Sequence, residues 1–123
     1  MTDRRPCLDR PTNTSTLTSR YSQAPTSHMR PVRGLVEQRL CASGHVVNRI
    51  RSIYRWQGEI EDRPEAHVAL HTRAGLVPAI VDQTNARHPY VVPCVVATTI
   101  AAVNPAYRQW ILDQTQEPTG EYP

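Results

Sequence analysis

The chain has 123 residues, a formal net charge of +3 and 39% hydrophobic residues, which suits one domain with its own core. Its cysteines are few and lack CxxC spacing, and no apolar run approaches the roughly 20 residues of a membrane span, which argues against a disulfide scaffold and a membrane protein. Acidic and basic residues mix after residue 50, so we expect no nucleic acid and no membrane among its partners. The opening stretch MTDRRPCLDRPTNTST lacks the apolar centre of a signal peptide, and we expect a cytoplasmic protein.

The composition divides the chain into three parts. Residues 1–15 are rich in Arg, Pro, Thr and Asn, which cannot repay the entropy of ordering, and we expect a disordered tail. Residues 116–123 have the same character and predict a flexible end. The folded domain is therefore expected over residues 16–115.

The first half of the domain predicts a strand and a helix. Thr16–Ser22 (TLTSRYS) is β-prone but weakly apolar, so we expect a poor strand that weakens the fold. A helix is expected from about Pro25, with Gly44 able to stop it and Pro31 implying a kink or a late start. The apolar positions at helical spacing are Met29, Val32, Leu35, Val36 and Leu40.

The second half predicts a hairpin and a second helix. Ser52–Glu61 and Glu65–Thr72 read as two strands joined by the short connection DRP. Residues 76–84 then carry apolar side chains at helical spacing, with Pro78 tolerable only in the first turn. His45 is expected in the loop before the hairpin, as an ordinary surface residue.

A last strand and helix complete the pattern. Val91–Ile100 is a mostly apolar strand of the kind buried on one or both faces. Asn104 caps and Pro105 opens a helix with Tyr107, Trp110 and Ile111 on one side. The order of elements predicts an α+β, ferredoxin-like split βαβ sandwich, an antiparallel sheet with helices on one face. The other face is bare, and something must cover it.

Five stretches, in order, resemble the signatures of the CutA divalent-cation tolerance proteins: RGLVEQRLCAS, SIYRWQGEIE, VALHT, ARHPYVVPCVVATTI and NPAYRQWILDQT. The resemblance implies a homotrimer of PII-like architecture that is linked to tolerance of copper and other divalent metals. In such a trimer two further copies cover the bare sheet face, and the hairpin with Tyr54 and Trp56 reaches toward a neighbour.

The resemblance also implies metal ligation by histidine and cysteine. Of those positions this chain keeps His88, whereas Arg20 and Ser43 stand at the thiol positions, and Cys41 and Cys94 lie elsewhere. A soft thiolate and imidazole site therefore loses most of its ligands, and we expect weaker copper binding than in relatives that keep the thiols.

The hairpin offers a second set of metal ligands. With DRP as the loop, Glu61 would face Glu65 and Glu59 would face His67, and a carboxylate with an imidazole can hold zinc or copper. The alternative is a solvated tip neutralised by Arg63. His67 and His71 share one face of their strand but lie about 13 Å apart, too far to clamp one ion. The candidate metal ligands are His88, Glu59 and His67.

A small ligand between subunits is the other possibility that the resemblance raises. His71 stands where the family has a lysine, so a small anion there would bind more strongly at acid pH. In the alternative, His88 and Tyr90 only fix the turn before the last strand. The candidate cleft residues are Tyr54, Trp56, Glu61, His71, Tyr90 and Trp110.

No GxSxG, P-loop or HExxH motif is present, and we expect no enzymatic activity. The leading hypothesis is a non-catalytic trimer for divalent-metal tolerance. The alternatives are a PII-like signalling or scaffold trimer with no metal site of its own, and an enzyme.

Overall fold

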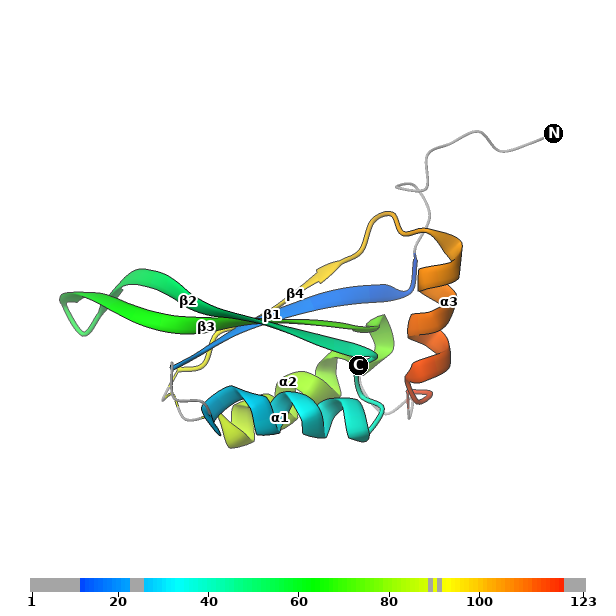
Figure 1. Ribbon diagram of the computed structural model, residues 1–123, viewed down its shortest axis with the longest axis horizontal. Helices are drawn as coiled ribbons and strands as arrows, with labels where there is room; N and C mark the ends of the chain where they lie inside the picture. Colours follow the sequence, from blue (N-terminus) through cyan, green and yellow to red (C-terminus); the bar gives the residue numbers. More distant parts are fainter. Residues whose placement is uncertain (1–11, 23–25, 89, 91, 119–123) are drawn as a thin grey trace.

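The computed structural model describes residues 12–22, 26–88, 90 and 92–118. The elements run β1 (Thr14–Ser22), α1 (Thr26–Glu37), β2 (Ser43–Trp56), β3 (Glu59–Arg73), the short 3₁₀ helix η2 (Ala74–Leu76), α2 (Val77–Arg87), β4 (Val95–Thr99) and α3 (Pro105–Gln114). The strands form one antiparallel sheet in the order β2-β3-β1-β4. This is the ferredoxin-like arrangement that the sequence predicts (Figure 1).

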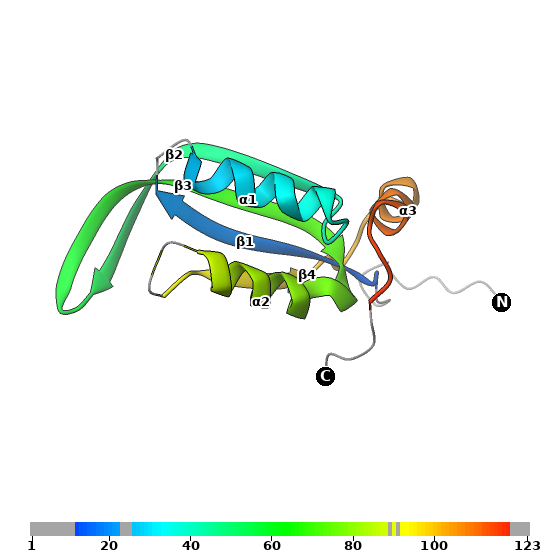
Figure 2. The same cartoon turned by 90° about the horizontal axis from the view of Figure 1, so that it is seen from below.

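Helices α1 and α2 lie side by side on one face of the sheet, as expected, whereas α3 stands across one end of it (Figures 1 and 2). The hydrophobic core fills the space between the sheet and these two helices. Its buried members are Leu17, Tyr21, Leu35, Leu40, Cys41, Val68, Leu70, Leu76 and Ile80. The opposite face, called the outer face below, carries neither α1 nor α2. None of the helices in the described ranges is long and apolar enough to cross a membrane.

The polar first strand lies at the centre of the sheet, between β3 and β4. Leu17 and Tyr21 are buried toward the helices, at 1% and 5% exposure. The strand begins at Thr14, which is itself fully buried, so the expected domain boundary at Thr16 falls inside it. Residues 1–11 of the expected tail lie outside the described residues. Two flanking strands thus hold β1 in place despite its low apolar content.

The hairpin turns at Gln57 and Gly58, and the expected DRP loop is wrong. Both turn residues have positive φ, 49° and 81°, which is the signature of a two-residue type I′ turn. Pro64 instead lies within β3 opposite Arg51. Because β1 ends opposite Glu65, β3 has only β2 beside it at this point, and a proline is tolerated on such an edge.

Helix α1 continues through Pro31 and ends at Glu37, so the expected stop at Gly44 is also wrong. Arg39 takes a left-handed conformation (φ 60°), and the amide of Leu40 donates to the carbonyl of Leu35 at 3.0 Å. This is a Schellman motif formed without glycine. Gly44 lies in β2, where an added Cβ would come within 2.3 Å of Val32.

The last strand is shorter and more exposed than predicted. β4 spans five residues at the sheet edge, and Val96 is 51% exposed in the single chain. Val91 lies outside the described residues. The two helix starts are confirmed, because Pro78 occupies the first turn of α2 and Pro105 opens α3. Asn104 stands at the N-cap position of α3, but its side chain makes no capping hydrogen bond.

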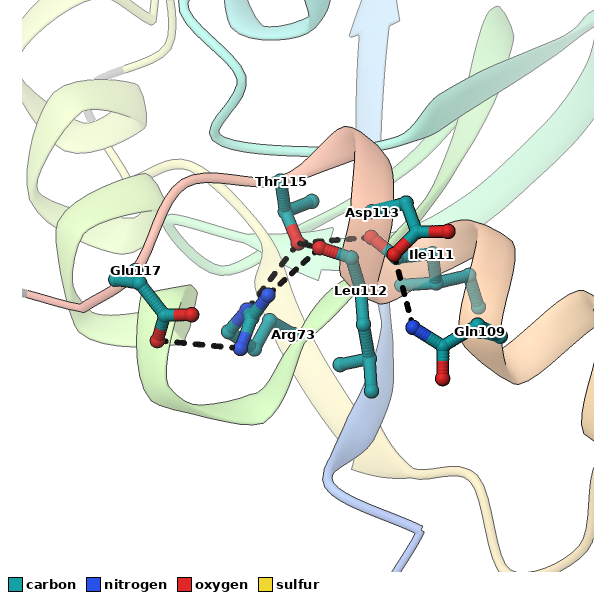
Figure 3. Close-up of polar contacts among 7 residues, drawn as sticks. All are labelled: Arg73, Gln109, Ile111, Leu112, Asp113, Thr115 and Glu117. Atoms are coloured by element: carbon teal, nitrogen blue, oxygen red, sulfur yellow. Dashed lines mark hydrogen bonds and ion pairs between the residues drawn. The ribbon is translucent and has the colours of Figure 1, made fainter.

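Arg73, the last residue of β3, holds the C-terminal end of α3 (Figure 3). Its guanidinium donates to the carbonyl of Leu112 at 2.6 Å and to the Thr115 hydroxyl at 3.3 Å, and it pairs with Glu117 at 3.4 Å. Thr115 and Glu117 are therefore in contact with β3, and residues 119–123 of the expected flexible end lie outside the described residues. The same contacts fix α3, which carries Tyr107 and Trp110, against β3.

Candidate functional site

Polar and aromatic side chains form two clusters, one around Glu65 and one around His71. The Glu65 cluster comprises Glu65, Arg20, Tyr54, His88 and Tyr90, and the His71 cluster comprises His71, His45, Tyr107 and Trp110. Six positions along β3 separate Glu65 from His71, a distance of about 20 Å. The candidate cleft residues therefore do not meet within one chain, and their meeting between subunits stays a prediction.

Glu65 is a buried carboxylate with one oxygen left open. Its side chain is 3% exposed, and one oxygen accepts a hydrogen bond from the Tyr90 hydroxyl. The other oxygen, Oε1, lies 4.0 Å from the Arg20 guanidinium and has no hydrogen-bond partner in the part of the chain that the structure describes. A buried, incompletely bonded carboxylate is costly, so a further donor at Oε1 would stabilise this site.

The neighbours of Glu65 also contact one another. The Arg20 guanidinium lies 5.7 Å from the ring centre of Tyr54, within the range of a cation–π contact. Burial raises the pKa of Tyr90 well above its usual range, and the hydrogen bond to Glu65 raises it further. The Tyr90 phenol therefore stays protonated and donates a hydrogen bond to the Glu65 carboxylate.

Both ring nitrogens of His88 already have partners. Because a carbonyl only accepts, Nε2 carries the proton that binds the Arg20 carbonyl at 2.8 Å, and Nδ1 accepts from the Tyr90 amide at 3.1 Å. Burial lowers the pKa of His88, which favours this neutral ring. A metal at His88 would have to displace one of these bonds, so the geometry favours the turn-fixing role.

The His71 cluster joins β2, β3 and α3. Nδ1 of His71 lies 2.8 Å from the Tyr107 hydroxyl, and the Tyr107 ring stacks on Trp110 at 5.5 Å between centres. His45 lies in β2 with its ring 5.4 Å from that of His71, so its expected place in a loop is wrong. Burial lowers the pKa of His71, and the nearby charge of His45 lowers it further.

The carboxylate and imidazole pair expected at the hairpin tip does not form. The true register places Glu59 opposite Trp56 and Glu61 opposite Tyr54, while Glu59 and His67 lie eight positions apart on β3, about 26 Å. Arg63 pairs with Glu61 at 2.9 Å on the exposed tip, as the alternative predicts. Among the described residues no three His, Cys, Asp or Glu side chains gather as metal ligands would.

Of the two thiols in the described region, Cys41 offers little to a metal. Cys41 is 1% exposed, and burial raises its pKa to about 12, so it stays protonated at neutral pH. Cys94 is a half-buried free thiol.

A hollow of about 260 Å³ lies at the helix-covered side of the molecule. Arg30 and Arg87 contribute positive charge to it, which favours an anion, and His88 links it to the Glu65 cluster. The lining residues are Tyr21, Arg30, Pro31, Gly34, Leu35, Gln83, Thr84, Arg87 and His88.

Comparison with known proteins gives the same family as the sequence motifs. The family model of the CutA1 divalent ion tolerance protein matches residues 19–114. The chain belongs to the CutA1 family. A CutA1 relative, the divalent-cation tolerance protein CutA of Thermus thermophilus, is 39% identical over 83 residues, which are 68% of this chain and 81% of the relative. Human protein CutA is 38% identical over 84 residues. This CutA1 chain spans about half the length of the mouse and human relatives, 48% and 47%.

Solved CutA1 structures share the fold. The crystal structure of CutA1 from Ehrlichia chaffeensis superposes with a TM-score of 0.79 at 28% identity, over 85% of this chain and 97% of that one. The protein from Thermus thermophilus gives a TM-score of 0.78 at 31% identity, over 84% and 99% of the two chains. The ferredoxin-like CutA1 architecture is thus confirmed for the single chain.

Sequence reasoning missed several members of the two clusters in this CutA1 chain. Arg20 on β1 and Glu65 on β3 are diagonal neighbours on adjacent strands, because Arg20 lies opposite His67 and Glu65 lies opposite Ser22. The two-residue alternation of β3 signals that Glu65 and His71 share a face. The place of His45 beside His71 has no such signal, because it depends on the start of β2 and on the hairpin register.

Proposed function

We propose that this chain forms a homotrimer that takes part in the tolerance of divalent metal ions, copper among them, without catalysing a reaction. Membership of the CutA1 family supports the tolerance role, since the family and its bacterial relative carry that description. The cytoplasmic location expected from the sequence agrees with the free thiols of Cys41 and Cys94.

The observation that carries the assembly is the exposed apolar surface of the outer face and hairpin. Val47 and Val96 on the outer face are 53% and 51% exposed, and at the tip Ile53 and Ile60 are 65% and 59% exposed. Trp56 beside them is 38% exposed. Apolar patches of this kind mark contact surfaces, and closed cyclic symmetry is the usual solution for copies of one chain.

A second candidate function is a signalling trimer that binds a small effector. The Glu65 cluster favours it, because an open carboxylate oxygen beside the Arg20 guanidinium would be completed by a ligand that carries both an amino and a carboxylate group. In this reading the chain has no metal site of its own. Thermal-shift measurements with free amino acids, on the wild type and on Glu65→Gln, test this candidate.

The tolerance role is tested by growth. Cells that lack the gene should grow less well than the parent on elevated Cu²⁺ or Zn²⁺, and a plasmid copy should restore growth. Equal growth of the deleted and parent strains across both metals would contradict the role.

A further inference from the structure

Two imidazoles stand side by side on neighbouring strands of the outer face. His71 lies opposite Ser43 and His45 opposite Ala69, so the two histidines are diagonal neighbours. Their ring centres are 5.4 Å apart and their planes meet at 61°. Two ring nitrogens that each lie about 2.0–2.1 Å from one ion bring the ring centres to about 5 Å. The pair therefore already stands at the separation that shared ligation needs.

Tyr107 holds the His71 ring in a suitable orientation. When Nδ1–H of His71 donates to the Tyr107 hydroxyl oxygen, 2.8 Å away, Nε2 carries a lone pair and no proton. Within the described ranges Nε2 of His71 has no hydrogen-bond partner, unlike either nitrogen of His88. Metal-bound histidines usually have such a partner behind the second nitrogen, which fixes the ring and its tautomer.

The surroundings suit a metal ion that keeps some water. His45 is exposed in the single chain, and the Ser43 hydroxyl lies 3.5 Å from its Nε2. Imidazole nitrogens with water oxygens are the donor set that Cu²⁺ prefers, and Cu²⁺ binds most tightly among the divalent first-row metals.

We propose that His45 and His71 form a two-imidazole site for a transition-metal ion, with Cu²⁺ bound most tightly and water in the remaining positions. This site is separate from His88, the ligand position that the family resemblance implies. A role of this site in the cell rests on the proposed function. The binding of the ion rests on the geometry of the two imidazole rings.

Calorimetry of the full chain with Cu²⁺ alone, in a buffer that does not chelate copper, tests the site. His45→Gln and His71→Gln should each weaken Cu²⁺ binding by at least about tenfold. His67→Gln is the matched control, because His67 lies on the same face of β3 about 13 Å from His71. The Cu²⁺ affinity of this variant should equal that of the wild type. Unchanged affinity in both test variants, or an equal loss in the control, would overturn the proposal.

Electron paramagnetic resonance of the Cu²⁺-loaded protein identifies the ligand atoms independently. The wild type should show nitrogen coupling from two imidazoles, and each test variant should lose one of them. A sulfur-ligated spectrum would place the ion at a cysteine instead and overturn the site. If the two-imidazole site is upheld while the deleted strain grows normally on metals, the tolerance role fails and the site stands. If the site is overturned while the deleted strain grows poorly on metals, the site fails and the tolerance role stands.

Discussion

Removing the Tyr90 hydroxyl tests how strongly the fold depends on the hydrogen bond from Tyr90 to the buried Glu65 carboxylate. In Tyr90→Phe the Glu65 carboxylate, 3% exposed, loses the donor to one oxygen while the other still has only the Arg20 guanidinium at 4.0 Å. A buried polar group left without its partner costs about 1–3 kcal/mol, and more when it is charged. We expect Tyr90→Phe to lower the free energy of unfolding by about 2 kcal/mol.

Glu65→Gln provides the matched background for the same change. The Gln side chain keeps an acceptor for the Tyr90 hydroxyl but removes the buried charge, so Tyr90→Phe in this background should cost only about 1 kcal/mol, the worth of a neutral hydrogen bond. Urea unfolding of the four proteins at pH 7 and one fixed chain concentration gives the cycle. A loss below about 0.5 kcal/mol in Tyr90→Phe, or equal losses in both backgrounds, would show that the Glu65 carboxylate does not depend on the Tyr90 hydroxyl.

Three further changes follow from single contacts. Gly44→Ala should destabilise the fold by about 1–3 kcal/mol in thermal unfolding, because the new Cβ would lie 2.3 Å from the stiff side chain of Val32; an unchanged melting temperature would contradict this close approach. The stability that depends on neutral His71 and His88 should be fully present above about pH 6.5 and should decline as the pH falls through their lowered pKa values, because the unfolded chain then binds more protons. In a series of unfolding curves at different pH, His88→Gln should flatten this decline. An unaltered slope would exclude His88 as a source of the pH dependence. Arg73→Ala should speed amide exchange in the last turn of α3, where its guanidinium holds two oxygens, and unaltered exchange there would show that other contacts fix the helix.

The sequence predicts the elements whose signals are local. Pro78 and Pro105 mark the first turns of α2 and α3 because a proline costs little where the amide has no helical partner. The order of strands and helices then leads directly to the ferredoxin-like topology.

The errors come from positions where tertiary context outweighs the local signal. Pro64 indicates a turn, but it lies where β3 has lost one neighbour, so the chain could turn earlier at Gln57 and Gly58. The polar strand β1 reads as marginal by its own composition, yet it is central because β3 and β4 flank it.

The candidate site was less predictable for the same reason. Alternation along β3 places His67 and His71 on one face, which the structure confirms. The contacts of His45 and Tyr107 with His71 depend on the strand register and on the docking of α3. Neither can be read from spacing along the chain.

Sedimentation equilibrium of the full chain at micromolar concentration tests the proposed trimer, in which the exposed outer face and hairpin form the contacts between copies. Three chains of 13.9 kDa should sediment together as one species of about 42 kDa. A stable single species of 13.9 kDa would contradict the trimer and leave the apolar outer face unexplained.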